Sequence, residues 1–575
     1  MENRVKKRKG IGASSGIAIG RAQVVNTASP VSDSTAKTAD KEAELAALDH
    51  AIATFCETTE RLANRLDESG GTGEILRGHI LMISDPFMTS GIKDKIEQGY
   101  SAADAVCEMC DMFITAFEAS EDDLTRQRAA DVRDIKGRLL DILGGNGVTE
   151  LCDLPPNTVL IVDELTPSMT AEMDREHVIG VVTHRGGLTS HCAILARSMK
   201  IPAVLSVPDD AFDVQTGDSV ALNGDTGEVW LAPDENTVAR LRALDAEERK
   251  KNEQYKTFIG KKTLTKDGEI RHLFSNIGSD REIGLVLEND AEGVGLFRTE
   301  FLFMGRNSLP DEEQQLAAYR AAATGLHGKP LIIRTLDIGG DKDIPYLGLE
   351  KEENPFLGYR AIRFCLSNRN IFQTQLRAIL RASAFGDVRI LLPLIVELEE
   401  LQQAKEIIEE VKETLRRQAV PFDEHIPVGV MIETPAACMI AEFLAKEADF
   451  FSIGTNDLTQ YIMAADRGNA HVASLYSPFR PAVLRAIRHV IASAKEAGIP
   501  AGMCGEAASD RYLIPLFLAF GLTEFSVTPS LVLSVRAEIS RWSQKRAEEI
   551  AEHVMSLSSE AEIRSYLASV VDCNL

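Results

Sequence analysis

The chain has 575 residues, too many for one hydrophobic core, so we expect about three to four domains. Hydrophobic residues make up 44% of it and charged residues 26%, as in soluble globular proteins, and no apolar run approaches the roughly 20 residues of a membrane span. The net charge of −25 argues against a general nucleic-acid binder, which needs clustered lysine and arginine, and favours a basic protein partner.

The amino terminus and the cysteines both indicate a protein that stays in the cytoplasm. Residues 10–20 are too rich in Gly and Ser to form the apolar region of a signal peptide. The 9 cysteines, an odd number scattered over a long chain, suit reduced thiols rather than a disulfide framework. Cys107 and Cys110 form a C-x-x-C pair, but they share a helical face with Val106 and Phe113, so we interpret them as core residues rather than a redox or zinc site.

The first part of the chain predicts a small α/β domain with a helical insertion. Residues 11–25 predict a glycine-punctuated strand and turn. Amphipathic helical patterns then follow at 45–66, 75–83, 103–117 and 132–143. Strand patterns return at 159–162, 178–182, 203–205 and 219–222, and helix starts at Thr166 and Thr189 lie between them. We therefore expect the α/β domain to be interrupted by an all-helical subdomain.

One histidine, His191, lies at the start of the helix that begins near Thr189. Free backbone N–H groups and the positive end of the helix dipole favour an anion there, so a phosphohistidine would be stable. Thr189 and Ser190 can cap the helix, and Gly186 and Gly187 let another molecule approach the ring. A histidine at a helix start also serves as a packing or capping residue, so these residues alone leave both interpretations open.

The second part of the chain predicts a (β/α)8 barrel. Residues 234–258 are charged and sparsely apolar, which is typical of an exposed linker helix. Beyond them short apolar strands alternate with helices, and the strands begin at Leu273, Val294, Leu331, Ile390, Val428, Phe450, Ala501 and Phe525. In such a barrel the catalytic residues cluster at the carboxyl ends of the strands.

Polar side chains follow several of these strands. The strand ends carry Arg298, Arg334, Glu433, Asn456, Asp457 and Cys504, and the following loops carry Arg360 and Arg467. Arginines on one rim can bind phosphate and carboxylate oxygens in pairs of hydrogen bonds, and two carboxylates on successive strands can hold Mg²⁺. A single arginine here could be a surface ion-pair residue, and a single cysteine could be buried core. Their joint placement favours a site for a small, strongly anionic substrate.

These motifs carry a resemblance to a known family. The chain resembles, over nearly its whole length, the Enzyme I family of the bacterial sugar phosphotransferase system. The most specific stretches are 186–197, 295–303, 354–363, 429–437, 452–461, 466–469 and 502–506. The sequence departs from the family's usual pattern at Leu188, Cys192, Tyr359 and 526–530. Pyruvate phosphate dikinase and phosphoenolpyruvate synthase share the phosphohistidine and barrel domains, but they need an ATP-grasp domain for which this chain has no room.

The resemblance implies an enzyme that moves the phosphoryl group of phosphoenolpyruvate to its own histidine and then to the phosphocarrier protein HPr, as the first step of sugar uptake. His191 would carry the group on Nε2, and Thr170 would hydrogen-bond the other ring nitrogen. Arg298, Arg334, Asn456, Asp457 and Arg467 would bind phosphoenolpyruvate, Glu433 and Asp457 would ligate Mg²⁺, and Cys504 would protonate carbon 3 of the enolate. A regulatory protein that docks HPr and turns over poorly is the alternative of a different class.

The same resemblance implies the domain organisation and the partners. Residues 1–22 and 147–233 would form the α/β phosphohistidine domain, 23–146 the helical HPr-binding subdomain, 234–262 the linker helix, and 263–575 the phosphoenolpyruvate-binding barrel. We expect a cytoplasmic homodimer that associates through the barrel, with Mg²⁺ as cofactor. We expect neither nucleic-acid binding nor membrane insertion.

Overall fold

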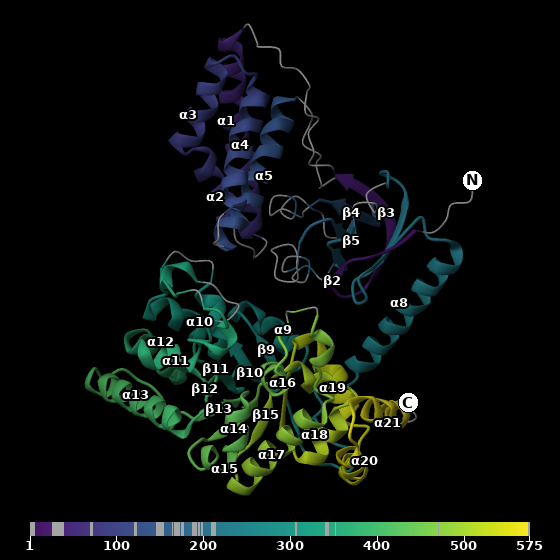
Figure 1. The fold of residues 1–575 in the computed structure, drawn as a ribbon, viewed down its shortest axis with the longest axis vertical. Coiled ribbons are helices and arrows are strands. Elements are labelled where there is room, and N and C mark those ends of the chain that lie inside the picture. The colour runs from purple at the N-terminus through teal and green to yellow at the C-terminus, as the bar shows by residue number, and fades with distance from the viewer. Residues whose placement is uncertain are drawn as a thin grey trace. The chain divides into compact units, whose positions relative to one another are not determined.

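Contacts within the computed structural model divide the chain into two units, Met1–Lys250 and Lys251–Leu575, and each is described by itself (Figure 1). The structure describes residues 6–25, 40–68, 73–119, 123–144, 154–163, 165, 169, 173, 177–186, 193, 196, 199, 201–208, 214–304, 308–339, 344–350, 352–467, 469 and 471–572.

The first unit contains an 8-stranded sheet in the order β1-β8-β7-β3-β4-β5-β6-β2. Its strands are β1 (Lys6–Lys9), β2 (Ile11–Ser14), β3 (Ile17–Val25), β4 (Thr158–Val162), β5 (Val178–Thr183), β6 (Ala203–Leu205), β7 (Ser219–Asn223) and β8 (Glu228–Leu231). The central strands β3 to β6 run parallel, and β2, β7, β8 and β1 join antiparallel at the edges. Since β4 and β6 are entirely buried, their unbroken apolar patterns are those of central parallel strands. The strand patterns predicted from sequence are confirmed, and β1 and β8 are additional.

The described residues between β3 and β4 form helices, as predicted. Its helices are α1 (Lys41–Glu68), α2 (Glu74–Ile83), α3 (Pro86–Glu97), α4 (Ala102–Glu118) and α5 (Asp123–Leu143). Buried Leu48, Phe55 and Val106 belong to one core that these helices share. Short polar residues begin two of the helices, because the Ser101 and Asp85 side chains accept hydrogen bonds from backbone N–H groups of α4 and α3. A further helix, α8 (Glu235–Lys256), lies where a linker helix was predicted, and Leu241 is its only buried residue.

The second unit is a closed barrel of eight parallel strands, which confirms the predicted (β/α)8 architecture. The strands are β9 (His272–Ile277), β10 (Val294–Arg298), β11 (Leu331–Arg334), β12 (Val388–Leu392), β13 (Val428–Ile432), β14 (Phe450–Ile453), β15 (Ala501–Met503) and β16 (Glu524–Val527). Strand β16 pairs with β9 and closes the barrel. The helices are α9 (Ile283–Glu288), α10 (Glu312–Gly325), α11 (Ile362–Ser367), α12 (Arg369–Ala382), α13 (Leu398–Arg417), α14 (Pro435–Met439), α15 (Ala441–Leu444), α16 (Thr455–Met463), α17 (Pro481–Ala497), α18 (Ile514–Phe520), α19 (Val532–Ile539), α20 (Gln544–Ser556) and α21 (Glu560–Asp572).

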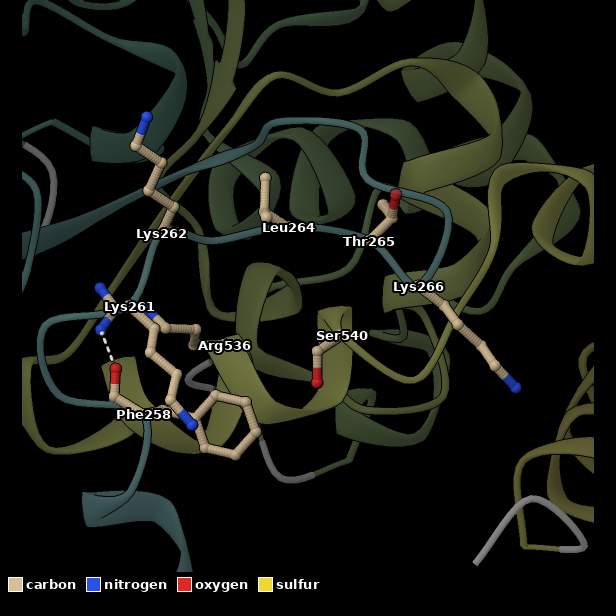
Figure 2. A pocket seen from close by; sticks show the side chains of 8 residues that line it. All are labelled: Phe258, Lys261, Lys262, Leu264, Thr265, Lys266, Arg536 and Ser540. Atoms are coloured by element: carbon tan, nitrogen blue, oxygen red, sulfur yellow. Dashed lines mark hydrogen bonds between the residues drawn. The ribbon is translucent and has the colours of Figure 1, made fainter.

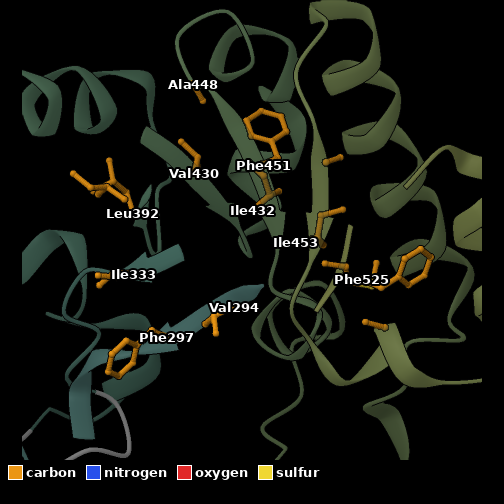
Figure 3. Close-up of a cluster of buried hydrophobic side chains, with 14 of the residues drawn as sticks. Val294, Phe297, Ile333, Leu392, Val430, Ile432, Ala448, Phe451, Ile453 and Phe525 are labelled. Atoms are coloured by element: carbon orange, nitrogen blue, oxygen red, sulfur yellow. The ribbon is translucent and has the colours of Figure 1, made fainter. Parts of the chain in front are cut away.

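Side chains of successive strand residues enter two different cores. Val430 and Ile432 belong to the large core between strands and helices, part of which is drawn in Figure 3. Met431, between them, belongs to a small core inside the barrel, whose members come from successive strands: Leu296, Ile332, Leu391, Met431, Phe450 and Cys504. This alternation is that of strands buried on both faces. It places Cys504 inside the barrel, at the carboxyl ends of the strands.

Among the residues that the structure describes, no helix has the length and apolar character needed to cross a membrane.

Candidate active site

The predicted barrel residues that the structure describes converge on one end of the barrel. Arg298 and Arg334 are the last residues of β10 and β11, and Glu433 and Cys504 directly follow β13 and β15. Asn456 and Asp457 lie in the first turn of α16, just after β14. Because all eight strands are parallel, their carboxyl ends meet on one rim.

A buried chain of ion pairs runs along this rim. Arg334 Nη2 lies 2.6 Å from Glu300 Oε1, and Arg334 Nη1 lies 2.9 Å from Asp337 Oδ2. Arg360 Nη2 donates to Asp337 Oδ1 at 2.9 Å and to Asp457 Oδ2 at 3.1 Å. None of these side chains is more than 10% exposed. Arg334 and Arg360 are therefore spaced and oriented by the carboxylates before any substrate arrives.

Sequence reasoning missed Glu300 and Asp337. Each lies two or three residues after a rim arginine, in Arg298-Thr-Glu300 and Arg334-Thr-Leu-Asp337. An acidic residue at that spacing after a strand-end arginine was a usable signal, but the arginine it pairs with is visible only in the fold. Glu300 follows Arg298 in the chain and pairs with Arg334.

The loop that carries Arg360 lies against the loop that follows β11. Gly339 adopts a positive φ of 99°, and a Cβ on it would lie 2.6 Å from Arg360 Cβ and 3.0 Å from the Tyr359 carbonyl oxygen. A glycine is therefore required for the close approach. Tyr359, where the sequence departs from the family pattern, is oriented by its N–H, which donates to Glu352, and by its hydroxyl, which accepts from Asn368 at 2.8 Å.

The rim holds more acidic than basic buried side chains. Glu433, Asp457, Glu300 and Asp337 face two buried guanidinium groups, Arg334 and Arg360. Burial raises the pKa of the Glu433 carboxyl, and the charges of Asp457 and Asp337 raise it further, against the lowering effect of the two arginines. Among the residues that the structure describes, none donates a hydrogen bond to buried Asp457 Oδ1.

A divalent cation fits this arrangement. Carboxylate oxygens are the ligands that Mg²⁺ prefers, and Glu433 and Asp457 supply them where positive charge is lacking. Within the described ranges no three His, Cys, Asp or Glu side chains form a metal-binding cluster. Mg²⁺ commonly takes one or two carboxylates and completes its coordination with substrate oxygens and water, so two protein ligands are sufficient.

The remaining rim residues are more open. Arg467 Nη1 lies 3.9 Å from Asp457 Oδ1, and its side chain is 37% exposed. Asn456 and Glu506 are joined by two hydrogen bonds: Asn456 Nδ2 donates to Glu506 Oε1 at 3.3 Å, and the Glu506 N–H donates to Asn456 Oδ1 at 3.1 Å. Arg298 makes no ion pair within the described part of the chain. Its guanidinium and that of Arg467 can therefore reach a bound anion.

Cys504 is a buried thiol beside these charged groups. It is 4% exposed, and its Sγ lies 3.8 Å from the Ile453 carbonyl oxygen. Burial raises the pKa of the Cys504 thiol above its usual range, more than the hydrogen bond with Ser452 and the charges of Arg334 and Arg298 lower it. The group therefore stays protonated at neutral pH and has a proton to donate.

The predicted residues of the α/β domain lie outside the described residues. These are His191, Thr170, Leu188 and Cys192. Close to His191 in the sequence, Ala193 and Ala196 are buried in the core that includes Leu160 and Val181. Gly186 has a positive φ of 120°.

A described cavity lies elsewhere in the second unit. It measures ≈ 590 Å³ and is formed by the segment that leads into β9 and by α19 and Ser540, away from the carboxyl rim (Figure 2). The Arg536 guanidinium in it is already engaged, since it donates to the Phe258 carbonyl at 3.1 Å and to Asp290 Oδ2 at 2.7 Å. The Lys262 and Lys266 ammonium groups point in different directions in Figure 2. This cavity does not bring acidic, basic and thiol side chains together, as the rim does.

Three family models match the chain. They are described as "PEP-utilising enzyme, N-terminal" over residues 9–128, "PEP-utilising enzyme, mobile domain" over 154–227, and "PEP-utilising enzyme, PEP-binding domain" over 252–544.

Similar proteins match almost end to end. A phosphoenolpyruvate-protein phosphotransferase of Geobacillus stearothermophilus is 43% identical over 98% of this chain and 98% of its own. One of Bacillus subtilis (strain 168) is 41% identical over 98% of this chain and 99% of its own. An NMR solution structure of an Enzyme I protein is 33% identical, covers 42% of this chain and 99% of its own, and has a TM-score of 0.36.

Proposed function

Because this chain belongs to the phosphoenolpyruvate-protein phosphotransferase family and transfers a phosphoryl group from phosphoenolpyruvate, we propose that His191 carries that group and passes it to the histidine of HPr, as the first step of sugar uptake by the phosphotransferase system. The observation that carries the proposal is the convergence of buried Arg334, Arg360, Glu433 and Asp457 with Cys504 on one barrel rim.

The rim binds and orients the donor. Arg298, Arg334, Arg360 and Arg467 bind the phosphate and carboxylate oxygens of phosphoenolpyruvate, and Asn456 donates from its amide. Glu433 and Asp457 hold Mg²⁺. When bound, Mg²⁺ supplies positive charge that offsets the negative charge on the transferring phosphoryl oxygens. Phosphoryl transfer depends chiefly on positioning and charge neutralisation, and both are provided by a preorganised set of ion pairs.

The reaction has two bond-making steps. The lone pair of His191 Nε2 attacks phosphorus, the P–N bond forms, and the P–O bond to the enol oxygen breaks, so that the enolate of pyruvate leaves. Thr170 accepts a hydrogen bond from the other ring nitrogen and keeps Nε2 free to attack. Cys504 then gives its S–H proton to carbon 3 of the enolate, which forms pyruvate, and the thiolate regains a proton from water.

HPr docks on the helical subdomain, residues 23–146. Large apolar side chains are exposed on three neighbouring elements there: Leu81 on α2, Phe87 on α3 and Met112 on α4. Phe87 packs edge-on against Phe113, with ring centroids 5.9 Å apart, which holds it in place while it stays 65% exposed. Exposed aromatic and Met side chains are typical of a protein-binding surface.

The phosphohistidine domain comprises residues 1–22 and 147–233, the linker 234–262, and the barrel domain 263–575. The barrel also mediates homodimerisation, and its rim loops and short helices expose apolar side chains that would be buried between two copies: Leu357, Tyr359, Met439, Phe443 and Leu475. The enzyme acts in the cytoplasm, because Cys504 must remain a free thiol and the cysteines that the structure describes are free.

Labelled phosphoenolpyruvate tests the proposal. Incubation with Mg²⁺ is expected to give one acid-labile phosphate, on His191, which HPr then removes; without Mg²⁺ labelling slows greatly. His191→Ala abolishes the label, whereas the matched control His184→Ala retains it. Persistent acid-labile phosphate on His191→Ala would contradict the assignment. Poor turnover of the parent enzyme with Mg²⁺ and HPr would favour the regulatory alternative.

A further inference from the structure

Asn276 lies inside the barrel near its carboxyl rim, on β9. It is paired in register with Leu296 of β10, whose side chain belongs to the interior core, and neighbours in register point to the same face. The side chain of Asn276 is therefore directed into the barrel, toward the seam where β9 and β16 meet.

The Asn276 amide uses its hydrogen-bonding groups across this seam. Nδ2 donates to the carbonyl oxygen of Cys504 at 3.0 Å and to that of Ser526 at 3.2 Å. Oδ1 accepts from Ser526 Oγ at 2.7 Å. The two carbonyls determine which way the amide faces, because a flipped amide would present its oxygen to them, and the Ser526 hydroxyl then donates to Oδ1.

The Cys504 carbonyl lies beyond the pairing of the described strands. Strand β15 ends at Met503, and its pairing with β16 ends at Met503 and Phe525. On the other side of the residue, the Cys504 N–H donates to the Ile453 carbonyl of β14 at 3.1 Å. Cys504 is therefore held at both backbone ends, by the β14 backbone and by the Asn276 side chain.

The turn that follows Cys504 is also closely held. A Cβ on Gly505 would lie 1.9 Å from Thr455 Oγ1, so this backbone touches the first turn of α16, which carries Asn456 and Asp457. With both backbone ends and the next residue held, the direction of the Cys504 Cα–Cβ bond is determined, and with it the position of the thiol relative to the rim.

We propose that Asn276 is a positioning residue for the proton-transfer step, holding the Cys504 carbonyl so that the thiol faces one side of the enolate. The inference rests on the proposed role of Cys504 as proton donor. A donor that must reach one face of a planar carbon needs its position held within a fraction of an ångström, and a shift of about 1 Å can cost about 100-fold in rate.

The test compares Asn276→Ala with Thr523→Val and Cys504→Ala. Thr523 is the matched control, because its Oγ1 donates to the Ala501 carbonyl at 2.8 Å, across the seam between β15 and β16 but at the amino end of the strands. Phosphoenolpyruvate labelled stereospecifically at carbon 3 is turned over in deuterated water. The measurements are the chirality of the pyruvate methyl group, the turnover rate, the single-turnover rate of His191 labelling, and the melting temperature.

Asn276→Ala is expected to lower turnover about 10- to 100-fold and to give partly racemic methyl groups, while His191 labelling stays within about threefold of the parent. Thr523→Val is expected to lower the melting temperature similarly and to keep one methyl configuration. A single configuration with parental turnover in Asn276→Ala, or equal racemisation in Thr523→Val, overturns the proposal.

Cys504→Ala separates this outcome from failure of the proposed function. If Cys504→Ala keeps one configuration, Cys504 is not the donor and both ideas are wrong. If Cys504→Ala racemises and Asn276→Ala does not, only the positioning role is wrong. Should Asn276→Ala fold poorly, Ser526→Ala removes the hydrogen bond that holds the amide oxygen, and a single configuration with parental turnover in that variant overturns the proposal.

Discussion

Arg360 and Asp457 are joined by a hydrogen bond of 3.1 Å from Nη2 to Oδ2, in a place where neither side chain is more than 10% exposed. The bond links an arginine that we assign to the substrate with a carboxylate that we assign to the metal. Asp337 shares the same Nη2 group at 2.9 Å, so loss of Arg360 affects two acidic residues at once.

Arg360→Met is expected to lower both stability and turnover. It leaves buried Asp457 without its close cation, while Asp337 keeps Arg334, and this costs about 3–5 kcal/mol; it also removes a phosphate ligand, so turnover falls by about 100-fold or more. Calorimetry and initial rates of pyruvate formation measure the two effects. Arg369→Met is the matched control, because Arg369 pairs with Glu410 at 2.8 Å on the surface, where a pair is worth about 0–1 kcal/mol. Equal losses in both variants would argue against a role for Arg360 in the site.

Neutralising either proposed metal ligand should raise the Mg²⁺ requirement. Glu433→Gln and Asp457→Asn each remove a carboxylate from the rim, and transfer should slow by orders of magnitude. Mg²⁺ activation curves for His191 labelling measure this. Glu524→Gln is the control, since Glu524 is also a buried carboxyl whose pKa is raised by burial, but it lies at the start of β16, at the other end of the barrel. Unchanged Mg²⁺ dependence in both rim variants would mean that the metal binds elsewhere.

Gly454→Ala should have a similar but milder effect without changing any charge. A Cβ at this position would lie 2.8 Å from Glu433 Oε2 and 2.9 Å from Glu433 Cβ, so the carboxylate must move. We expect the Mg²⁺ concentration for half-maximal labelling to rise about tenfold, the equivalent of about 1.4 kcal/mol. Gly284→Ala, in helix α9 with nothing within 4 Å of the new Cβ, should leave the curve unchanged. An unaltered curve for Gly454→Ala would contradict the assignment of Glu433 as a metal ligand.

The helical subdomain should lose stability as pH rises. His79 on α2 is 1% exposed and lies between Asp131 and Asp134 of α5, at 3.2 Å and 3.4 Å. Burial alone lowers the pKa of His79, but hydrogen bonds and charges from the two aspartates raise it to about 9. Since the unfolded value is about 6.5, the stabilisation is complete below about pH 6.5 and is lost as pH rises through 9, by about 3 kcal/mol.

Hydrogen–deuterium exchange of α2 and α5 amides in the full chain, corrected for intrinsic rates, measures this at pH 6 and pH 9.5. His79→Gln should make protection of the two helices nearly independent of pH over that range. Equal protection of the parent at the two pH values would show that His79 is not held protonated in the fold.

The strand pattern of the barrel was predictable because each strand is buried on both faces. The predicted starts coincide with the observed ones at Val294, Leu331, Val428, Phe450 and Ala501. A strand buried on both faces needs a continuous apolar run, so the ends of that run mark the ends of the strand. Strand β1 (Lys6–Lys9) was missed because its sequence is Lys-Lys-Arg-Lys. Its strand conformation comes from pairing with β8 rather than from an apolar pattern.

By itself, the sequence determined which polar residues follow the barrel strands, because strand ends are marked by local patterns of apolar and polar residues. Only the tertiary structure decided which of them pair. Arg360 and Asp457 are 97 residues apart, and Asn276 and Cys504 are 228 apart. A hydrogen bond or ion pair depends on distances of about 3 Å between atoms that only closure of the barrel brings together, and no local periodicity encodes those distances.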